Sequence, residues 1–223
     1  AGTIDGFCVG EPWNSRAVQE GIGTVIATDP ELWNGHCEKV LGVRKEWADA
    51  YPRTHEALIK ALLEACQWCE DPDHREELAE LLSRTAYVGT APGTLRPGLV
   101  GPYDRGTGEP AAIADFIRFH GDHRNAPERQ EAVWILSQLA RWGLCPFPAD
   151  WEEVADRVQR RDLFRRAAAA VGHANAAACE CERASGPSPG LDYVGHRRSG
   201  GVGFALRRRH RRGRDGRILS QSE

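Results

Sequence analysis

A turn near the start of the chain has the composition of a small-anion site. An apolar run ends at Gly10, a proline and an aromatic residue follow at once, and Asn14-Ser15 then offers a helix N-cap. Backbone N–H groups at such a strand-to-helix turn can hold a small anion. A second candidate is Lys39, which follows the Gly35 turn and precedes another apolar run, so that its side chain can point into a cleft.

A Cys-x-x-Cys pair, Cys66 and Cys69, is the other group with possible chemistry. A redox role is disfavoured because the pair lies at the end of a long predicted helix, where the helix dipole opposes a thiolate. A zinc site needs two further ligands, which His55 and His74 offer only loosely. We predict no metal, no cofactor and no nucleophile–base pair. Seven cysteines at irregular spacing do not indicate a disulfide framework, and we interpret them as packing residues.

Composition limits the class of protein. Apolar residues make up 41% of the chain, enough for a core, and no run approaches the roughly 20 apolar residues of a membrane helix. No basic-then-apolar leader is present. The chain begins with Ala1, contains no methionine, and its first residues read as the end of a helix entering a strand. We therefore expect a cut N-terminus, whose lack of a leader says nothing about the compartment.

Charge is unevenly distributed. The formal net charge is -3, yet residues 180–223 hold ten arginines against five acidic residues, so the body is acidic. An acidic body does not indicate nucleic-acid binding. Residues 172–223 lack periodicity and predict a low-complexity tail, either disordered or non-native sequence from a shifted reading frame. A native basic tail could instead bind nucleic acid or a membrane surface.

Periodicity predicts strands first and helices afterwards. Short apolar runs predict three buried strands, at residues 4–9, 24–28 and 40–43. Apolar residues at helical spacing predict helices over residues 15–21, 45–51, 54–69, 73–82, 110–120, 127–142 and 151–170. In the longest of these, the inward stripe is predicted to be Leu58, Leu62, Ala65 and Cys69. Residues 89–110, which include Tyr103, predict a long loop that is functional or mobile.

Several segments occur together in an order that resembles one family. They are residues 6–14 (GFCVGEPWN), 38–42 (EKVLG), 67–69 (QWC), 134–143 (WILSQLARWG) and 161–168 (RDLFRRAA). Over residues 1–171 the chain resembles the C-terminal portion of the nitrate/nitrite/bicarbonate-binding proteins of ABC importers, the NrtA/CmpA family.

The resemblance implies an α/β, helix-rich fold: the C-terminal part of a type II periplasmic-binding-protein fold, followed by the tail of residues 172–223. In that fold a small anion lies in a cleft between two lobes. The resemblance also implies that residues 1–171 lack the first half of the protein. A lobe without its central strands would expose apolar helix faces and unpaired strand edges.

The same resemblance implies two ligand-binding residues. Lys39 stands where nitrate-binding members have an anion-contacting lysine, and the backbone at Gly10 contacts the anion, with no side chain to obstruct it. A buried planar oxyanion needs donors and usually one compensating cation, the role expected of Lys39. We expect Glu11 to pair with a neighbouring donor or to face water. His36 and Trp33 are assigned no contact.

The predicted function is therefore the non-enzymatic solute-binding component of an ABC importer that captures nitrate or nitrite. Its partners would be the permease and ATPase subunits, and its location the periplasm or the outer side of the inner membrane. Bicarbonate-binding members tend to have an acidic residue and a metal where this chain has Lys39, which favours nitrate or nitrite. The alternatives are cyanate or bicarbonate binding, and a cytosolic nitrate sensor that holds an RNA-binding antiterminator protein.

Overall fold

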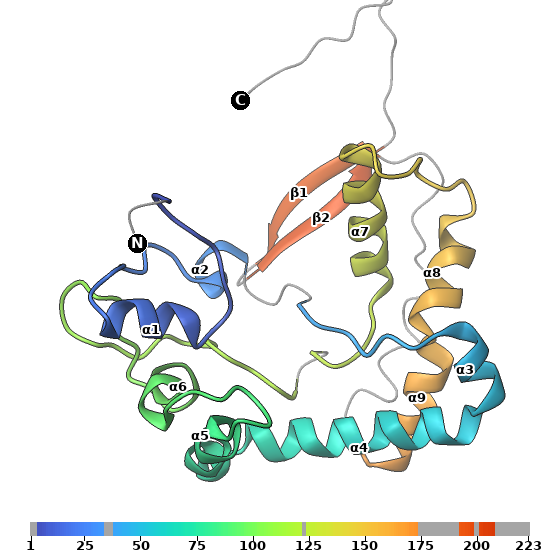
Figure 1. Cartoon of the computed structure of the whole chain (residues 1–223). Helices are drawn as coiled ribbons and strands as arrows, with labels where there is room; N and C mark the ends of the chain where they lie inside the picture. The colour runs from blue at the N-terminus through green and yellow to red at the C-terminus, as the bar shows by residue number, and fades with distance from the viewer. Residues whose placement is uncertain (1–3, 34–37, 122–123, 174–191, 199–200, 208–223) are drawn as a thin grey trace, which may run out of the picture. The chain divides into compact units, whose positions relative to one another are not determined.

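The computed structural model describes residues 4–33, 38–121, 124–173, 192–198 and 201–207. It divides into two units, residues 1–179 and 180–223, and each is described by itself. The first unit is helical (Figure 1). Its helices are α1 (Trp13–Gln19), α2 (Asp29–Trp33), α3 (Lys45–Ala50), α4 (Pro52–Glu70), the 3-10 helix η1 (Pro72–His74), α5 (Arg75–Ser83), α6 (Pro92–Leu99), α7 (Arg129–Arg141), α8 (Trp151–Gln159) and α9 (Arg161–Ala170).

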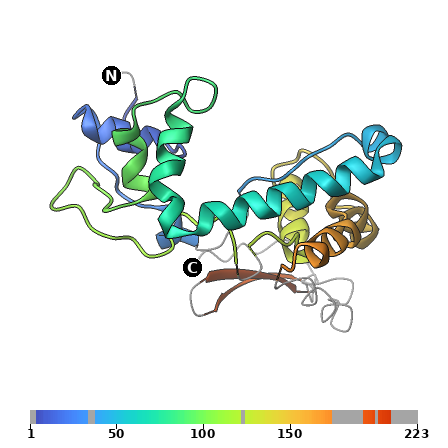
Figure 2. The same cartoon turned by 90° about the horizontal axis from the view of Figure 1, so that it is seen from below.

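The longest helix, α4, packs against other helices at both of its ends. It starts at Pro52, a position where the missing N–H of proline would have no helical partner anyway. It ends before Asp71, whose side chain accepts a hydrogen bond from the Asp73 N–H at 3.0 Å and so starts η1. Figure 2 shows α4 running from α3 and α9 at one end to α5 at the other, and it packs against all three.

The core between α4 and α9 is built from Leu63, Phe164 and Ala168. The predicted inward stripe of α4 is wrong for Leu58, Leu62 and Ala65, which are exposed, whereas its last member, Cys69, is partly buried. The side chains that turn inward or are partly covered are instead His55, Ile59, Leu63 and Cys66. Both sets have helical spacing, so the periodicity of α4 does not distinguish them.

A second packing group joins α1, α5 and α6. Its buried residues include Ala17, Leu78, Ala79 and Leu95. Helix α6 lies inside residues 89–110, where the sequence predicts a loop, and it contains Pro97 in its interior. Glycine and proline have low helix propensity, so here packing overrides the local preference.

The helix predicted over residues 110–120 does not form. Asp115 adopts a left-handed conformation with φ 55°, which a continuous right-handed helix excludes. The N–H groups of Phe119 and His120 donate to the Glu70 side chain rather than to a preceding turn. A contact distant in sequence therefore holds this segment.

The three segments predicted as buried strands are not paired in a sheet, and most of their apolar side chains are exposed. Ile26 is 94% exposed and Val40 is 86% exposed. Within the described part of the first unit, the strand pairing is a single bridge between Tyr103 and Ala111. A strand needs a neighbour along its length, and among the described residues the 24–28 segment has one such backbone bond, from the Val25 N–H to the Arg105 carbonyl at 2.8 Å.

The second unit contains two antiparallel strands, β1 (Asp192–Arg198) and β2 (Gly201–Arg207), with Val194 opposite Ala205. The sequence predicts no regular element there. Most other residues of the predicted tail lie outside the described residues, and the domain boundary after residue 171 stays a prediction. Among the helices that the structure describes, none is long and apolar enough to cross a membrane.

Candidate functional site

The turn at Gly10 is open to solvent. The Gly10 carbonyl accepts a hydrogen bond from the Trp13 N–H at 3.3 Å, and no atom lies within 4 Å of where a Cβ of Gly10 would be. Asn14 does not cap α1, which already begins at Trp13. Its Nδ2 instead donates to the Val9 carbonyl at 2.7 Å and so holds the incoming chain against the helix. A small ligand can therefore approach the backbone of this turn.

Glu11, next to Gly10, accepts hydrogen bonds on both carboxylate oxygens. Ser15 Oγ donates to Oε2 at 2.6 Å, and the Tyr103 hydroxyl donates to Oε1 at 2.6 Å. Ser15 and Tyr103 are both almost fully buried. Burial, and then the nearby Glu11 carboxylate, raise the pKa of the Tyr103 hydroxyl above its usual value, so it remains a donor. Glu11 thus pairs with neighbouring donors, one of the two arrangements expected from the sequence.

Lys39 lies at the surface, with its side chain 82% exposed. Its ammonium group pairs with the carboxylate of the adjacent Glu38, which is 59% exposed. In this structure Lys39 is therefore not a buried counter-charge. The anion contacts predicted for Lys39 and Gly10 stay predictions. His36 lies outside the described residues.

The segment that leads toward Lys39 is held by an ion pair. Arg105 Nη2 donates to Glu31 Oε1 at 2.8 Å, and the Arg105 carbonyl accepts from the Val25 N–H at 2.8 Å. The other oxygen of Glu31 accepts from the N–H and hydroxyl groups of Thr28, at 2.8 Å and 3.0 Å. The hydrogen bond from Arg105 and those from Thr28 lower the pKa of Glu31 to about 2. Glu31 therefore stays ionised and caps the start of α2.

Beside the Gly10 turn lies an open hollow of about 530 Å³. It is lined by Phe7, Cys8, Val9, Trp13, Arg16, Ala17, Glu20 and Ile22. The charge of Arg16 is already paired with Glu20 at 2.7 Å. The hollow is thus mainly apolar, and Arg16, the cation in its lining, is already paired with a carboxylate.

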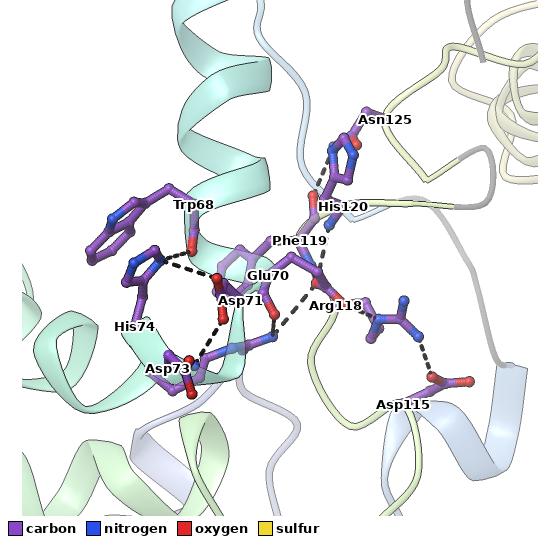
Figure 3. Close-up of polar contacts among 11 residues, drawn as sticks. Trp68, Glu70, Asp71, Asp73, His74, Asp115, Arg118, Phe119, His120 and Asn125 are labelled. Carbon is purple, nitrogen blue, oxygen red and sulfur yellow. Dashed lines mark hydrogen bonds and ion pairs between the residues drawn. The ribbon is translucent and has the colours of Figure 1, made fainter. Parts of the chain in front are cut away.

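Figure 3 shows a second polar cluster, around Glu70 at the end of α4. Its carboxylate accepts from the Phe119 N–H at 2.7 Å and the His120 N–H at 3.2 Å, and it pairs with the Arg118 guanidinium at 2.5 Å. Burial alone would raise the pKa of Glu70, but these donors outweigh it and the pKa lies below its usual value. Arg118 also pairs with Asp115 at 2.7 Å, and Arg75 pairs with Glu70 at 3.5 Å, so both carboxylates of the cluster have arginine partners.

The Cys66 and Cys69 thiols do not have the character of reactive groups. Burial raises the pKa of both thiols, whereas a nucleophilic or redox cysteine needs a lowered pKa. His74 stacks on Trp68 with ring centroids 4.4 Å apart, and His55 packs edge-on against Trp47. These histidines thus take part in packing. In the described ranges no group of three or more His, Cys, Asp or Glu side chains is arranged to hold a metal ion.

The contacts that tie residues 101–111 to the Gly10 turn and to α2 were not predicted. Tyr103 and Glu11 are 92 positions apart, and no local pattern joins them. The only signal was the length of the Gly- and Pro-rich stretch around Tyr103. It predicted a functional or mobile loop but did not identify the residues that the loop contacts.

Comparison with known proteins identifies relatives of this chain. The model of the NMT1-like family matches residues 1–83. The nitrate import ATP-binding protein NrtC of Synechocystis sp. is 53% identical over 173 residues, which are 77% of this chain and 26% of that protein. The nitrate/nitrite binding protein NrtA of Synechococcus elongatus is 40% identical over 172 residues, which are 77% of this chain and 39% of that protein.

A solved structure has the same fold. The crystal structure of the periplasmic nitrate-binding protein NrtA from Synechocystis PCC 6803 matches with a TM-score of 0.70 and 31% identity, over 83% of this chain and 47% of that one. This likeness confirms the helix-rich periplasmic-binding-protein fold predicted from the sequence. The chain spans about a quarter of the ATP-binding relative and about two-fifths of the nitrate/nitrite-binding one.

Proposed function

The chain belongs to the substrate-binding family of nitrate and bicarbonate transporters, and from this premise we propose that it forms one side of a site for a small oxyanion, nitrate or nitrite. The observation that carries the proposal is its likeness to the periplasmic nitrate-binding protein, with a TM-score of 0.70 at 31% identity. The open Gly10 turn agrees with the proposal, because the space beside Gly10 is free and a small ligand can reach its backbone.

In the proposal Lys39 supplies the positive charge. Its present partner is the neighbouring Glu38, and both side chains are largely exposed. Such surface ion pairs contribute little to stability, so an anion can replace Glu38 at low cost. Once the anion is enclosed between this surface and the rest of a binding site, the same lysine would be a desolvated partner and its contribution would rise.

The partners proposed for an importer component are a permease and an ATPase subunit, and its location is the periplasm or the outer face of the inner membrane. Chemistry on the anion is not part of this proposal. The proposed role is capture and release, for which hydrogen-bond donors and one cation suffice.

A second candidate follows from the ATP-binding relatives. NrtC of Synechocystis is 53% identical to this chain, compared with 40% for NrtA of Synechococcus elongatus. No lysine in residues 1–223 follows a glycine, so this region carries no P-loop of its own. In this second candidate, residues 4–173 are an anion-sensing region of an ATP-binding subunit, on the cytoplasmic side. The other alternative, a cytosolic nitrate sensor that holds an RNA-binding antiterminator protein, would use the same anion site.

The test of anion binding is a hybrid protein. Residues 4–173 replace the segment of the solved nitrate-binding protein that they match, and nitrate, nitrite, cyanate and bicarbonate are titrated by calorimetry. We expect nitrate or nitrite to bind within about tenfold of the affinity of the unaltered protein. A hybrid with normal circular dichroism that binds none of the four anions, or prefers bicarbonate, would contradict the proposal.

The two candidates differ in the polypeptide that carries residues 4–173. The mass and terminal sequences of the protein purified from its natural source separate them. A P-loop on the same polypeptide, with nitrate-dependent ATP hydrolysis, supports the sensing region, whereas export of a protein without a P-loop supports the importer component.

A further inference from the structure

Two histidines from distant parts of the sequence meet where α9 ends. Just after α9, Gly172 turns the chain with φ 68°, and the His173 N–H donates to the Ala168 carbonyl at 2.9 Å. This turn brings the His173 ring edge-on to the His120 ring, with the ring centroids 4.5 Å apart. We call His120 and His173 the histidine pair. The pair is a direct contact between the end of α9 and a segment that precedes α7 in the sequence.

The histidine pair is held by buried contacts. His173 is 6% exposed, and its ring centroid lies 6.0 Å from that of Phe164 in the core between α4 and α9. The Nε2 atom of His173 lies 3.3 Å from Asn125 Oδ1. Because Asn125 Nδ2 donates to the Phe119 carbonyl at 2.9 Å, its Oδ1 is the acceptor and His173 Nε2 carries the proton. These contacts fasten the end of α9 to residues 119–125.

The charged and titratable side chains around the histidine pair are neutral or already engaged with one another. From α4 and from the segments on either side of His120 they are Cys66, Glu70, Arg75, Asp115, Arg118 and Arg124. Glu70 accepts the His120 backbone N–H at 3.2 Å, but its carboxylate pairs with Arg118 (Figure 3). Arg124 pairs with Asp115 at 3.8 Å, and burial keeps the pKa of the Cys66 thiol high and the thiol neutral. On the side of α9, the pair meets the apolar residue Phe164.

Protonation of both rings would work against these contacts. The Nδ1 atom of His120 is buried and has no hydrogen-bond partner among the described residues. A charged imidazole carries a proton on both nitrogens, so that in His120 the Nδ1–H group would lack an acceptor. Two charged rings in contact also repel each other, and burial removes the water that would screen them. Burial, and then the charge of His120, accordingly lower the pKa of His173 below its usual value.

We propose that the histidine pair is a pH-sensitive latch, which fastens the end of α9 to residues 119–125 when its rings are neutral and releases it when they are protonated. With a folded pKa below the usual 6.5, His173 binds fewer protons in the closed form than in the open form. The latch is therefore fully closed above about pH 6.5 and weakens as the pH falls below that value. The inference stands on these contacts and does not depend on the proposed anion site.

The test measures amide hydrogen exchange in the full chain labelled with ¹⁵N, at about pH 7 and about pH 5. Exchange is expressed as protection factors, which correct for the intrinsic effect of pH on the exchange rate. The variants are His120→Phe and His173→Phe, which keep an aromatic ring that cannot be protonated. The matched control is His74→Phe, because His74 stacks on Trp68, with ring centroids 4.4 Å apart, and is not part of the latch. An NMR titration of the imidazole signals measures the pKa of His173 directly.

In the unaltered chain we expect protection at residues 164–173 to fall severalfold between the higher and the lower pH, because acid opens the latch. The fall should be smaller in His120→Phe, absent in His173→Phe and unchanged in His74→Phe. Equal protection at both pH values in the unaltered chain overturns the inference, and so does an undiminished fall in His173→Phe.

The imidazole titration decides the matter if His173→Phe does not fold. A pKa of His173 below 6.5 in the folded chain, with protection lost over the same pH range, supports the latch. A pKa at or above 6.5 refutes it, because the closed form would then bind protons at least as well as the open form.

Discussion

Replacement of Glu70 by glutamine should destabilise the first unit more than any exposed carboxylate on the same helix. The Glu70 carboxylate accepts two backbone N–H groups, at 2.7 Å and 3.2 Å, and pairs with Arg118. Glutamine keeps one acceptor oxygen but replaces the other with an NH₂ group. That group is itself a donor and would face the donors that surround Glu70. A hydrogen bond to a charged group is worth about 1.5–3 kcal/mol. Because the side chain is 23% exposed and therefore partly screened, we expect a loss of about 2 kcal/mol.

The pKa of Glu70 predicts how its contribution to the free energy of unfolding changes with pH. The pKa of Glu70 in the folded chain lies below its usual value near 4.5, so the stabilising contribution is complete above that value and is lost as the pH falls through the folded pKa. Glu70→Gln should therefore cost most near neutral pH and little in acid.

Urea unfolding followed by circular dichroism, at about pH 7 and about pH 3, measures both effects. Glu64→Gln is the control, because Glu64 is exposed on the same helix. Glu70→Gln would refute the reasoning if its unfolding free energy at neutral pH matched that of Glu64→Gln within about 0.5 kcal/mol.

Three further outcomes follow from the described contacts. Phe164→Ala leaves a cavity in the core between α4 and α9 and should lower the free energy of unfolding, measured in urea, by about 3–4 kcal/mol. The control Phe147→Ala, at a residue that is 37% exposed, should lower it much less. Equal losses in the two variants would contradict this core. Arg105→Gln should return the pKa of Glu31 from about 2 toward 4.5 in an NMR titration, so that its stabilising contribution is lost at higher pH; a pKa still near 2 would show that Arg105 is not the cause. The Cys66 thiol, with its raised pKa, should react slowly with a disulfide reagent until urea unfolds the chain, and fast labelling of the folded chain would contradict its burial.

Helices were predictable where periodicity and local breakers agreed. Helix α4 was predicted because apolar residues recur at helical spacing and the Asp71-Pro72 pair ends it. Residues 151–170 were predicted to be helical in the same way, and Arg160, with φ 46°, divides them into α8 and α9. Which face of α4 is buried was not predictable, because two stripes have equal spacing and only the position of α9 distinguishes them.

Strands were less predictable, because a strand depends on a partner. Residues 24–28 and 40–43 have the composition of strands, yet the described residues offer them no edge, and Ile26 and Val40 stand exposed. Helix α6 was missed for the opposite reason, since its Gly- and Pro-rich sequence argues against a helix that packing against α1 and α5 stabilises.

At the candidate site, local features were predictable from the sequence and contacts between distant residues were not. The open Gly10 turn could be predicted from its own residues. The hydrogen bond from Tyr103 to Glu11 could not, because it joins positions 92 residues apart. The charge of Lys39 was evident in the sequence, whereas its pairing with Glu38 at the surface needed the structure.

The central claim is that Lys39 provides the positive charge for a bound oxyanion. Calorimetric titration of nitrate into the hybrid protein tests it, with Lys39→Ala compared with Lys45→Ala, an equally exposed lysine that pairs with Asp49. We predict that Lys39→Ala weakens binding by about 2 kcal/mol, roughly 30-fold, while Lys45→Ala leaves it unchanged. Equal nitrate affinities in the hybrid and its Lys39→Ala variant would contradict the account.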